Sequence, residues 1–470
     1  MIKSFSEKTQ LFLLVLITAL SRLPFIFDGY GVEEDSWGLV VNAYEMKRTG
    51  HYLASRFPGH PLQEYIYRLI YDEPAWVYNF FSLLAGVVGV AFFFKALRKM
   101  QFSGAFFAAL MFCFTPVFYI AGTYTIDFAW TIAFVMVSFY FLMDRKLILS
   151  GIFIGMATGC RITSEIFLLP WALLLYSGLD LKTTIRNIFR ISIPAILVGA
   201  LWFIPVYHQY GKSFFDFSDQ FPYPSLAKVI YKATFGVFGF VGICVLGFYK
   251  LVGLKNVYRK NLQAVTLFRT ERLIFVCALI IVLHLVSYLR LPQKSGYMVP
   301  AIPFLILAIG LMLTEKQFRI ASFLFILSPF IFSINLTDPL RGSTASSLAM
   351  TFKVSGQEIF LDPLSGPIFS ERSKRVNKMN YCDEAIKIAG KMDYRYVIIS
   401  GWWYNELQVQ SLKTRKDFDE HFRFYEECPF LDSAKANGSA IYYLPEQDIY
   451  NDQMFGQSCT DSLAERFPEK

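Results

Sequence analysis

The chain has 470 residues and a formal net charge of +8, yet only 17% of its residues are charged and 54% are hydrophobic. Soluble globular domains carry about 25% charged residues, so long uncharged segments must account for the deficit. The composition therefore excludes an ordinary soluble enzyme. It predicts a polytopic α-helical membrane protein, because a helix is the open element that satisfies its own backbone hydrogen bonds in lipid.

Apolar stretches near the length that crosses a bilayer, about 20 residues, recur over the first two thirds of the chain. They predict about 11 transmembrane helices. The first is predicted to be a retained helix, because Ser21-Arg22-Leu23-Pro24 is a poor signal-peptidase site. The approximate cores of the predicted helices are residues 11–27, 75–94, 103–120, 126–143, 147–160, 164–180, 188–207, 233–253, 273–290, 296–314 and 318–335.

Lysine and arginine are concentrated in every second loop between these helices. With the N-terminus inside, the inner loops hold about 18 positive side chains, the pattern that sets orientation in the membrane. The net charge is therefore topological, and we expect no nucleic-acid partner. The N-terminus is predicted to be cytoplasmic, and the loop 28–74 and the tail 336–470 are predicted to be non-cytoplasmic, which means periplasmic or extracellular in a bacterium.

Two domains follow from this pattern. Residues 1–335 are predicted to form the transmembrane domain, in which the first outside loop, 28–74, carries interfacial helices. Residues 336–470 are predicted to form a small soluble domain of the α/β or α+β class, because a helical pattern at 382–392 precedes a strand-like run at 394–400. This tail holds three of the seven cysteines, of which one pair is able to form a disulfide: Cys382, Cys428 and Cys459.

The first outside loop carries three adjacent acids, Glu33, Glu34 and Asp35. Neighbouring carboxylates repel one another, so we expect one of them to stay protonated or to have a cation as partner. Such a carboxylate suits a general base that takes a proton from a hydroxyl group. The alternative is a solvated acidic loop. An amphipathic run, 37–49, follows and predicts a helix along the membrane interface.

Further polar side chains lie at the outer ends of predicted spans, where charge is costly and usually functional. Asp127 begins one span, and Arg161 lies at a junction between two. Arg290, Lys294 and Tyr297 lie at another outer junction. Cations in this position are suited to holding a phosphate group. The alternative is anchoring at the interface or structural ion pairing.

On these residues the sequence resembles the GT-C class of membrane glycosyltransferases, of the protein O-mannosyltransferase and aminoarabinose-transferase type. Within the class it most resembles a bacterial membrane family related to a vertebrate O-mannosyltransferase. That family carries a Gly-Asp-Ser-Gly-Glu motif and then His-Pro-Pro-Gly-Tyr-Pro-Leu. The corresponding segments here read Glu34-Asp35-Ser36-Trp37-Gly38 and Arg56-Phe57-Pro58-Gly59-His60-Pro61-Leu62.

Arg56 and Phe57 therefore replace the family's His and first Pro, and His60 replaces its Tyr. The second acid of the family motif is also absent. The spacing of the class, an acid followed by a small residue and then a glycine, is kept by Asp35, Ala43 and Gly50. Two more segments fit the class pattern: Asp127 to Pro170, and Pro292-x-Lys294-x-x-Tyr297-x-x-Pro300-x-x-Pro303.

The resemblance implies an inverting glycosyltransferase that moves a sugar from a polyprenyl-phosphate-linked donor to a protein, glycan or lipid acceptor on the outer face of the membrane. It implies Asp35 and Glu34 as the catalytic residues, with Asp35 as the catalytic base. The donor phosphate would be bound by Arg161, Arg290, Lys294 and Tyr297, with Asp127, Arg56 and His60 as secondary polar groups. Some members of the class use a divalent metal, for which Glu34 and Asp35 are candidate ligands.

Two other functions remain in competition. A transporter or lipid flippase should place charges near the middle of the membrane, often in two matching halves, whereas the ionisable residues here gather at one face and no halves repeat. A polymerase or ligase of cell-surface glycans shares the donor chemistry, so the acceptor alone distinguishes it.

Overall fold

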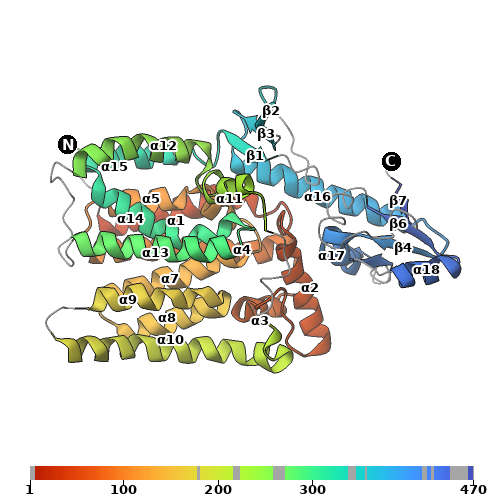
Figure 1. Ribbon diagram of the computed structural model, residues 1–470, viewed down its shortest axis with the longest axis horizontal. Helices are drawn as coiled ribbons and strands as arrows, with labels where there is room; N and C mark the ends of the chain where they lie inside the picture. Colours follow the sequence, from red (N-terminus) through yellow and green to blue (C-terminus); the bar gives the residue numbers. More distant parts are fainter. Residues whose placement is uncertain are drawn as a thin grey trace.

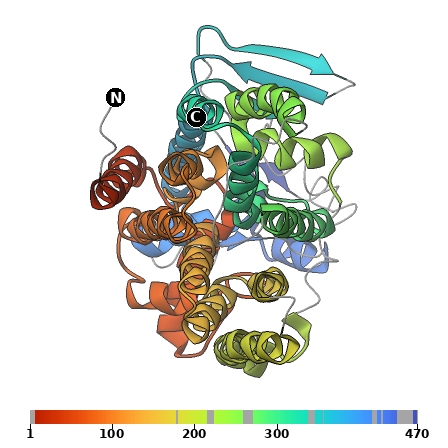
Figure 2. The ribbon, with the colours of Figure 1, turned by 90° about the vertical axis from the view of Figure 1, so that its left-hand side faces the viewer.

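The structure is a computed structural model that describes residues 6–176, 180–214, 223–257, 270–336, 346–354, 357–414, 421–424, 428–444 and 464–468. Most helices of the first 325 residues lie side by side in a bundle, and the C-terminal residues lie beyond one end of it (Figure 1). Helix α2 runs across that end, between the bundle and the C-terminal part (Figure 1). Figure 2 shows the bundle end-on, from the opposite end.

The bundle is built from α-helices joined by short connections and 3-10 helices. The 3-10 helices are η1 (Leu23–Phe25), η2 (Ile162–Phe167) and η4 (Ser295–Ala301). The α-helices are α1 (Glu7–Arg22), α2 (Glu34–Thr49), α3 (Pro61–Leu69), α4 (Ala75–Lys99), α5 (Ala105–Cys113), α6 (Pro116–Ala121), α7 (Asp127–Met143), α8 (Leu147–Cys160), α9 (Leu168–Leu175), α10 (Leu181–Tyr210), α11 (Leu226–Ala233), α12 (Phe235–Val257), α13 (Thr270–Arg290), α14 (Ile302–Met312) and α15 (Glu315–Phe325).

Several of these helices have the length and composition of membrane spans. Among the described residues, five are long and apolar enough: 7–25, α4, α10, α13 and 295–312. A sixth span results if α11 and residues 235–248, bent by 63°, count as one, and α7, α8 and residues 162–175 are apolar but shorter. On α10 the exposed side chains include Leu197, Leu201 and Ile204, which suits a lipid-facing surface. The chain is an integral membrane protein, whereas the count of about 11 spans stays a prediction.

Two predicted spans differ from the helices observed. The apolar run 103–120 is divided into α5 and α6, because Pro116 has no N–H to donate and holds the preceding Thr115 in an extended conformation. The run 318–335 is helical only as far as Phe325, since Pro329 lies shortly beyond the helix end and residues 333–336 form a strand. Apolar composition alone does not reveal these breaks.

The remaining residues that the structure describes form two sheets, three α-helices and a 3-10 helix. The strands β1 (Ser333–Leu336), β2 (Met350–Val354) and β3 (Gln357–Asp362) pair antiparallel in the order β1-β3-β2. The strands β4 (Tyr396–Ile399), β5 (Phe422–Arg423), β6 (Ala440–Tyr443) and β7 (Glu465–Arg466) form a parallel sheet in the order β5-β4-β6-β7. The helices are α16 (Pro367–Ala389), α17 (Tyr404–Thr414) and α18 (Cys428–Ala436), and η5 (Gly401–Trp403) precedes α17.

This C-terminal part has a hydrophobic core of its own, which includes Ile398 of the sheet, Leu407 of α17 and Cys382 of α16. The predicted strand at 394–400 contains β4, and the predicted helix at 382–392 is the end of the longer α16. The predicted boundary at residue 335 falls inside β1. Cys428 is disulfide-bonded and Cys382 is a buried cysteine that forms no disulfide, while Cys459 lies outside the described residues.

Close packing in the bundle fixes the helix ends that carry polar side chains. Helix α8 lies against α10 at Gly155, where an added Cβ would come within 2.5 Å of the Val198 Cβ. A continuous core of buried apolar side chains holds α4, α7 and α8 together, so the first residue of α7 and the residue after α8 have fixed positions. These two residues are Asp127 and Arg161.

Candidate active site

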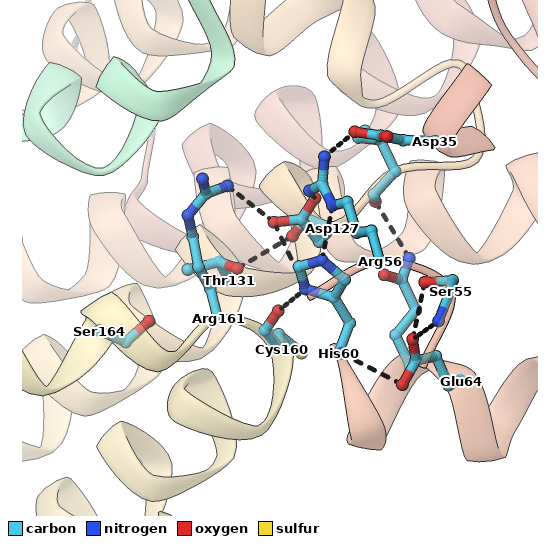
Figure 3. A network of polar contacts seen from close by, with 12 residues as sticks. Asp35, Ser55, Arg56, His60, Glu64, Asp127, Thr131, Cys160, Arg161 and Ser164 are labelled. Atoms are coloured by element: carbon cyan, nitrogen blue, oxygen red, sulfur yellow. Dashed lines mark hydrogen bonds and ion pairs between the residues drawn. The ribbon is translucent and has the colours of Figure 1, made fainter. Parts of the chain in front are cut away.

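Asp127 is the centre of a buried ion-pair network. Its side chain is 1% exposed, and it begins α7, where the helix dipole favours a carboxylate. One carboxylate oxygen accepts a hydrogen bond from Arg56 Nη2 at 2.7 Å, and the other accepts one from Arg161 Nη1 at 2.8 Å (Figure 3). Two guanidinium groups from distant parts of the chain therefore converge on one carboxylate.

Asp35 joins the same network through two cations. It stands in the first turn of α2, and its carboxylate contacts both Arg56 and Lys294. Arg56 thus bridges Asp35 and Asp127, as Figure 3 shows. Lys294 Nζ also lies 2.6 Å from the Glu33 carboxylate. A cation partner for the acidic run, one of the two expected alternatives, is therefore present.

Arg161 and Tyr297 are stacked on one another. The guanidinium carbon lies 4.3 Å from the centre of the Tyr297 ring and 5.1 Å from that of Phe128. The 3-10 helix η4 reaches this position because residue 296 is glycine: an added Cβ would come within 2.0 Å of the Phe128 ring. Among the described residues, Asp127 is the only hydrogen-bond partner of the Arg161 guanidinium, whose side chain is 16% exposed. Further N–H donors of Arg161 therefore remain for a ligand.

His60 links the loop 50–60 to the end of α8. Its Nε2 lies 2.8 Å from Arg56 Nε, which donates, and its Nδ1 lies 2.5 Å from the Cys160 carbonyl oxygen (Figure 3). This pattern requires a neutral ring with the proton on Nδ1. Burial lowers the pKa of His60 to about 4, and the Arg56 charge acts in the same direction, against the opposing effect of Asp127. We expect His60 to orient Arg56 and to stay neutral during the reaction.

This environment of His60 predicts a loss of stability in mild acid. The unfolded chain binds a proton at His60 below a pKa of about 6.5, whereas the folded chain binds it only near pH 4. The contribution of neutral His60 to the free energy of unfolding is therefore complete above pH 6.5. It is lost as the pH falls towards 4, and the loss is roughly 3 kcal/mol in all. The difference in thermal unfolding between wild type and His60→Gln should shrink across this window. His51→Gln, which changes an exposed histidine of the same loop, should leave the pH profile unaltered; a parallel profile for wild type and His60→Gln would contradict the assignment.

Glu64 was not predicted from the sequence, yet it organises the loop that carries Arg56. Its buried carboxylate accepts hydrogen bonds from the Ser55 backbone and hydroxyl, at 2.7 and 2.6 Å, and from the His60 backbone at 3.1 Å. Tyr52 donates a further hydrogen bond. Burial raises the pKa of Glu64, against the lowering effect of these donors. A proline followed by an acid in the first turn, as in Pro61 to Glu64, is a signal of a helix start that was available in the sequence.

The other predicted site residues have different positions. Arg290 ends α13 with an exposed side chain, and it makes no ion pair with a described residue, so it is not part of the network. Glu34 stands beside Asp35 in the first turn of α2 and is partly exposed. Within the described ranges, no three His, Cys, Asp or Glu side chains come close enough together to hold a metal ion. The resemblance allows a divalent metal at Glu34 and Asp35 without requiring one, and no third His, Cys, Asp or Glu ligand joins them among the described residues.

The fold and the site together define an integral membrane protein with a compact cluster of carboxylates and cations at one end of its helices. No family model matches the sequence, and no curated protein matches it either. Two solved structures of ArnT from Cupriavidus metallidurans match the chain. The structure bound to undecaprenyl phosphate matches at 14% identity and a TM-score of 0.45 over 65% of this chain and 60% of that one. The apo structure matches at 10% identity and a TM-score of 0.47 over 98% of this chain and 90% of that one.

Proposed function

We propose that the chain is an inverting glycosyltransferase that takes a sugar from a polyprenyl-phosphate-linked donor and transfers it to an acceptor at the outer face of the membrane. The observation that carries the proposal is that the Asp35 carboxylate contacts Arg56 and Lys294, and that Arg56 shares the Asp127 carboxylate with Arg161. A carboxylate suited to removing a proton thus stands beside cations suited to binding a phosphate.

In the proposed reaction, Asp35 takes the proton of the acceptor hydroxyl. The acceptor oxygen then attacks the anomeric carbon of the donor from the face opposite to the phosphate. The new bond joins that oxygen to the anomeric carbon, while the bond between this carbon and the phosphate oxygen breaks. Polyprenyl phosphate leaves with the bonding electron pair, and attack from the opposite face inverts the configuration at the anomeric carbon.

The cations supply the electrostatic part of the catalysis. Negative charge grows on the phosphate as its bond to the sugar breaks, and preorganised cations stabilise this charge more strongly where water is excluded. Lys294 and Arg161 are the side chains that we assign to this role, with Tyr297 as the surface on which Arg161 is held. Asp127 and His60 would keep the guanidinium groups of Arg56 and Arg161 oriented before the donor binds.

The orientation in the membrane is part of the proposal. The two ends of α7 are about 25 Å apart, since a helix rises 1.5 Å per residue. Asp127 stands at one end, and Asp144, just past the other end, pairs with the exposed cations Lys99 and Lys146. Cations in short loops at that second end favour a cytoplasmic position for it. The disulfide at Cys428 favours an oxidising, non-cytoplasmic compartment for the C-terminal part of the chain.

The acceptor and the sugar define the finer function. The resemblance favours a hexose or pentose donor and a protein, glycan or lipid acceptor. A polymerase or ligase of cell-surface glycans would use the same cluster, and a transporter or flippase is the alternative outside enzyme chemistry. The ion pairs of the candidate site lie at one end of the helices and not at mid-membrane, which favours an enzyme over an alternating-access transporter.

The purified full chain in lipid vesicles should release polyprenyl phosphate from radiolabelled polyprenyl-phosphate sugars and transfer the label to a membrane-extract acceptor. A nucleotide sugar with the same label should give no product, because it lacks the lipid that keeps the donor in the membrane. The product of an inverting enzyme has the opposite anomeric configuration from the donor. If folded protein turns over none of the donors while the vesicles translocate a lipid or a solute, the enzyme proposal is wrong.

A further inference from the structure

Helix α16 presents three cations to the loop that leads into the candidate active site. Arg372, Arg375 and Lys378 are spaced three residues apart, so they share one face of the helix. The first pairs with Asp28 at 3.1 Å, and the third donates a hydrogen bond to the Val32 carbonyl oxygen at 2.8 Å. Residues more than 300 positions away in the sequence therefore hold both ends of the segment 28–32.

Arg375 ties this helix to the membrane domain itself. Its side chain is 1% exposed, and its guanidinium donates to the Thr123 carbonyl oxygen at 3.1 Å and to the Thr123 hydroxyl at 3.0 Å. It also lies over the Tyr124 ring, with its central carbon 5.0 Å from the ring centre. Thr123 is four residues before Asp127. The same helix thus contacts the segments that precede both carboxylates of the site.

Lys378 is buried as well, and its charge is balanced by Glu406 of α17. Its side chain is 6% exposed, that of Glu406 is 0% exposed, and the two form an ion pair. The Lys378 ammonium also lies 5.0 Å from the centre of the Trp403 ring. A buried ion pair contributes little net stability, because desolvation offsets the attraction. Stabilisation of the fold therefore does not explain why Lys378 and Glu406 form a buried ion pair at this position.

The hydrogen bond from Lys378 to the Val32 carbonyl oxygen points to a different role, which is to position the start of α2. Val32 precedes Glu33, the N-cap of α2, and Asp35 lies in the first turn of that helix. Helix α17 packs against α2 as well: a Cβ added at Gly38 would lie 3.4 Å from the Asn405 side chain, and Val409 belongs to the same apolar cluster as Trp37. The position at which α2 begins is consequently set from the C-terminal part of the chain.

We propose that Lys378, held in place by Glu406, is a positioning residue for Asp35, and that the C-terminal part is therefore an integral component of the active site. This inference rests on the proposed function. Lys378 touches neither donor nor acceptor; it fixes the Val32 carbonyl, and through it the first turn of α2. A displacement of about 1 Å at a catalytic group is enough to cost about 10²-fold in rate.

The test uses the full chain in vesicles with the double variant Lys378→Met/Glu406→Met, which removes both charges and keeps the volume. Its thermal unfolding should remain close to that of wild type, because no unpaired charge is left in the interior. Hydrogen exchange in residues 28–40 should become faster, and kcat should fall by at least about tenfold with little change in the donor KM. Lys378→Arg, which keeps a donor for Val32, should restore most of the rate.

Lys387→Met makes the same change at an exposed position of α16 and is the control for handling and expression. Wild-type exchange in residues 28–40 together with wild-type kcat in the double variant would overturn the positioning role. If wild type itself transfers no sugar from any donor, the proposed function fails, and the exchange measurement still decides whether Lys378 holds the start of α2. The two proposals thus fail separately.

Discussion

Replacement of the Asp35 carboxylate by an amide, Asp35→Asn, is expected to lower the rate of sugar transfer by about 10²- to 10⁴-fold, the usual contribution of a general base. The amide has almost the same size and still accepts a hydrogen bond, so Arg56 and Lys294 keep an oxygen partner. It cannot accept the proton of the acceptor hydroxyl. We therefore expect kcat to fall while the donor KM changes little.

Two variants of nearby acids separate this role from a general effect of negative charge. Glu34→Gln changes the neighbouring acid, which is partly exposed, and should cost much less than Asp35→Asn. Asp72→Asn removes an exposed carboxylate of the same loop, whose contact is with the Tyr44 hydroxyl, and should leave transfer unchanged. The measurement is the initial rate of label transfer at equal amounts of folded protein. A rate for Asp35→Asn within a few-fold of wild type would assign the base elsewhere.

Much of the helical part was predictable because its signals are local. Helix α8 has the bounds that its apolar run predicts, and α2 ends at Gly50, whose positive φ of 76° is the usual glycine C-cap. The interruptions of helices within apolar runs were harder to predict. Pro116 lies within an apolar run, and its effect on the chain direction depends on packing that composition does not encode.

The site was predictable in part for a related reason. Charges at membrane depth are rare, so Asp35, Asp127, Arg161 and Lys294 stood out in the sequence, and the fold brings these four together. Arg290 was an equally clear candidate, but it lies two residues after the buried Tyr288 on α13. Two residues correspond to a rotation of about 200° around the helix axis, so the Arg290 side chain points away from the bundle.

The contribution of the C-terminal residues was beyond sequence reasoning. Lys378 and Arg375 belong to a helix whose polar face looks like an ordinary solvated surface, and their partners at Val32 and Thr123 are backbone carbonyl groups. Every residue has a backbone carbonyl group, so the amino-acid sequence does not indicate which carbonyl groups accept these hydrogen bonds. Contacts of this kind, far apart in the sequence and directed to the backbone, become visible only once the fold is known.

The largest expected effect on stability belongs to Asp127→Leu. This change removes the one carboxylate between Arg56 and Arg161, so Arg161 loses its ion-pair partner while Arg56 keeps only Asp35. The two arginine side chains are only 20% and 16% exposed. Breaking a buried ion pair by removing one partner costs about 3–5 kcal/mol, because the remaining charge stays desolvated. We expect a lower midpoint of thermal unfolding in detergent and loss of transfer activity. Asp127→Asn, which keeps the hydrogen-bond acceptor, should fall between wild type and Asp127→Leu.

Asp144 provides the matched control, because it lies at the opposite end of the same helix and also has two cationic partners. Lys99 and Lys146 contact it at 2.5 and 2.9 Å, but their side chains are 46% and 58% exposed. Water solvates these cations when the carboxylate is lost, so Asp144→Leu should leave the unfolding midpoint nearly unchanged. An equal decrease of the unfolding midpoint in Asp127→Leu and Asp144→Leu would contradict this prediction. The Asp127 network would then contribute no more to stability than the exposed ion pairs of Asp144. A loss confined to Asp127 would mean that the Arg56 and Arg161 charges are kept in a region of low polarity, where they attract a phosphate most strongly.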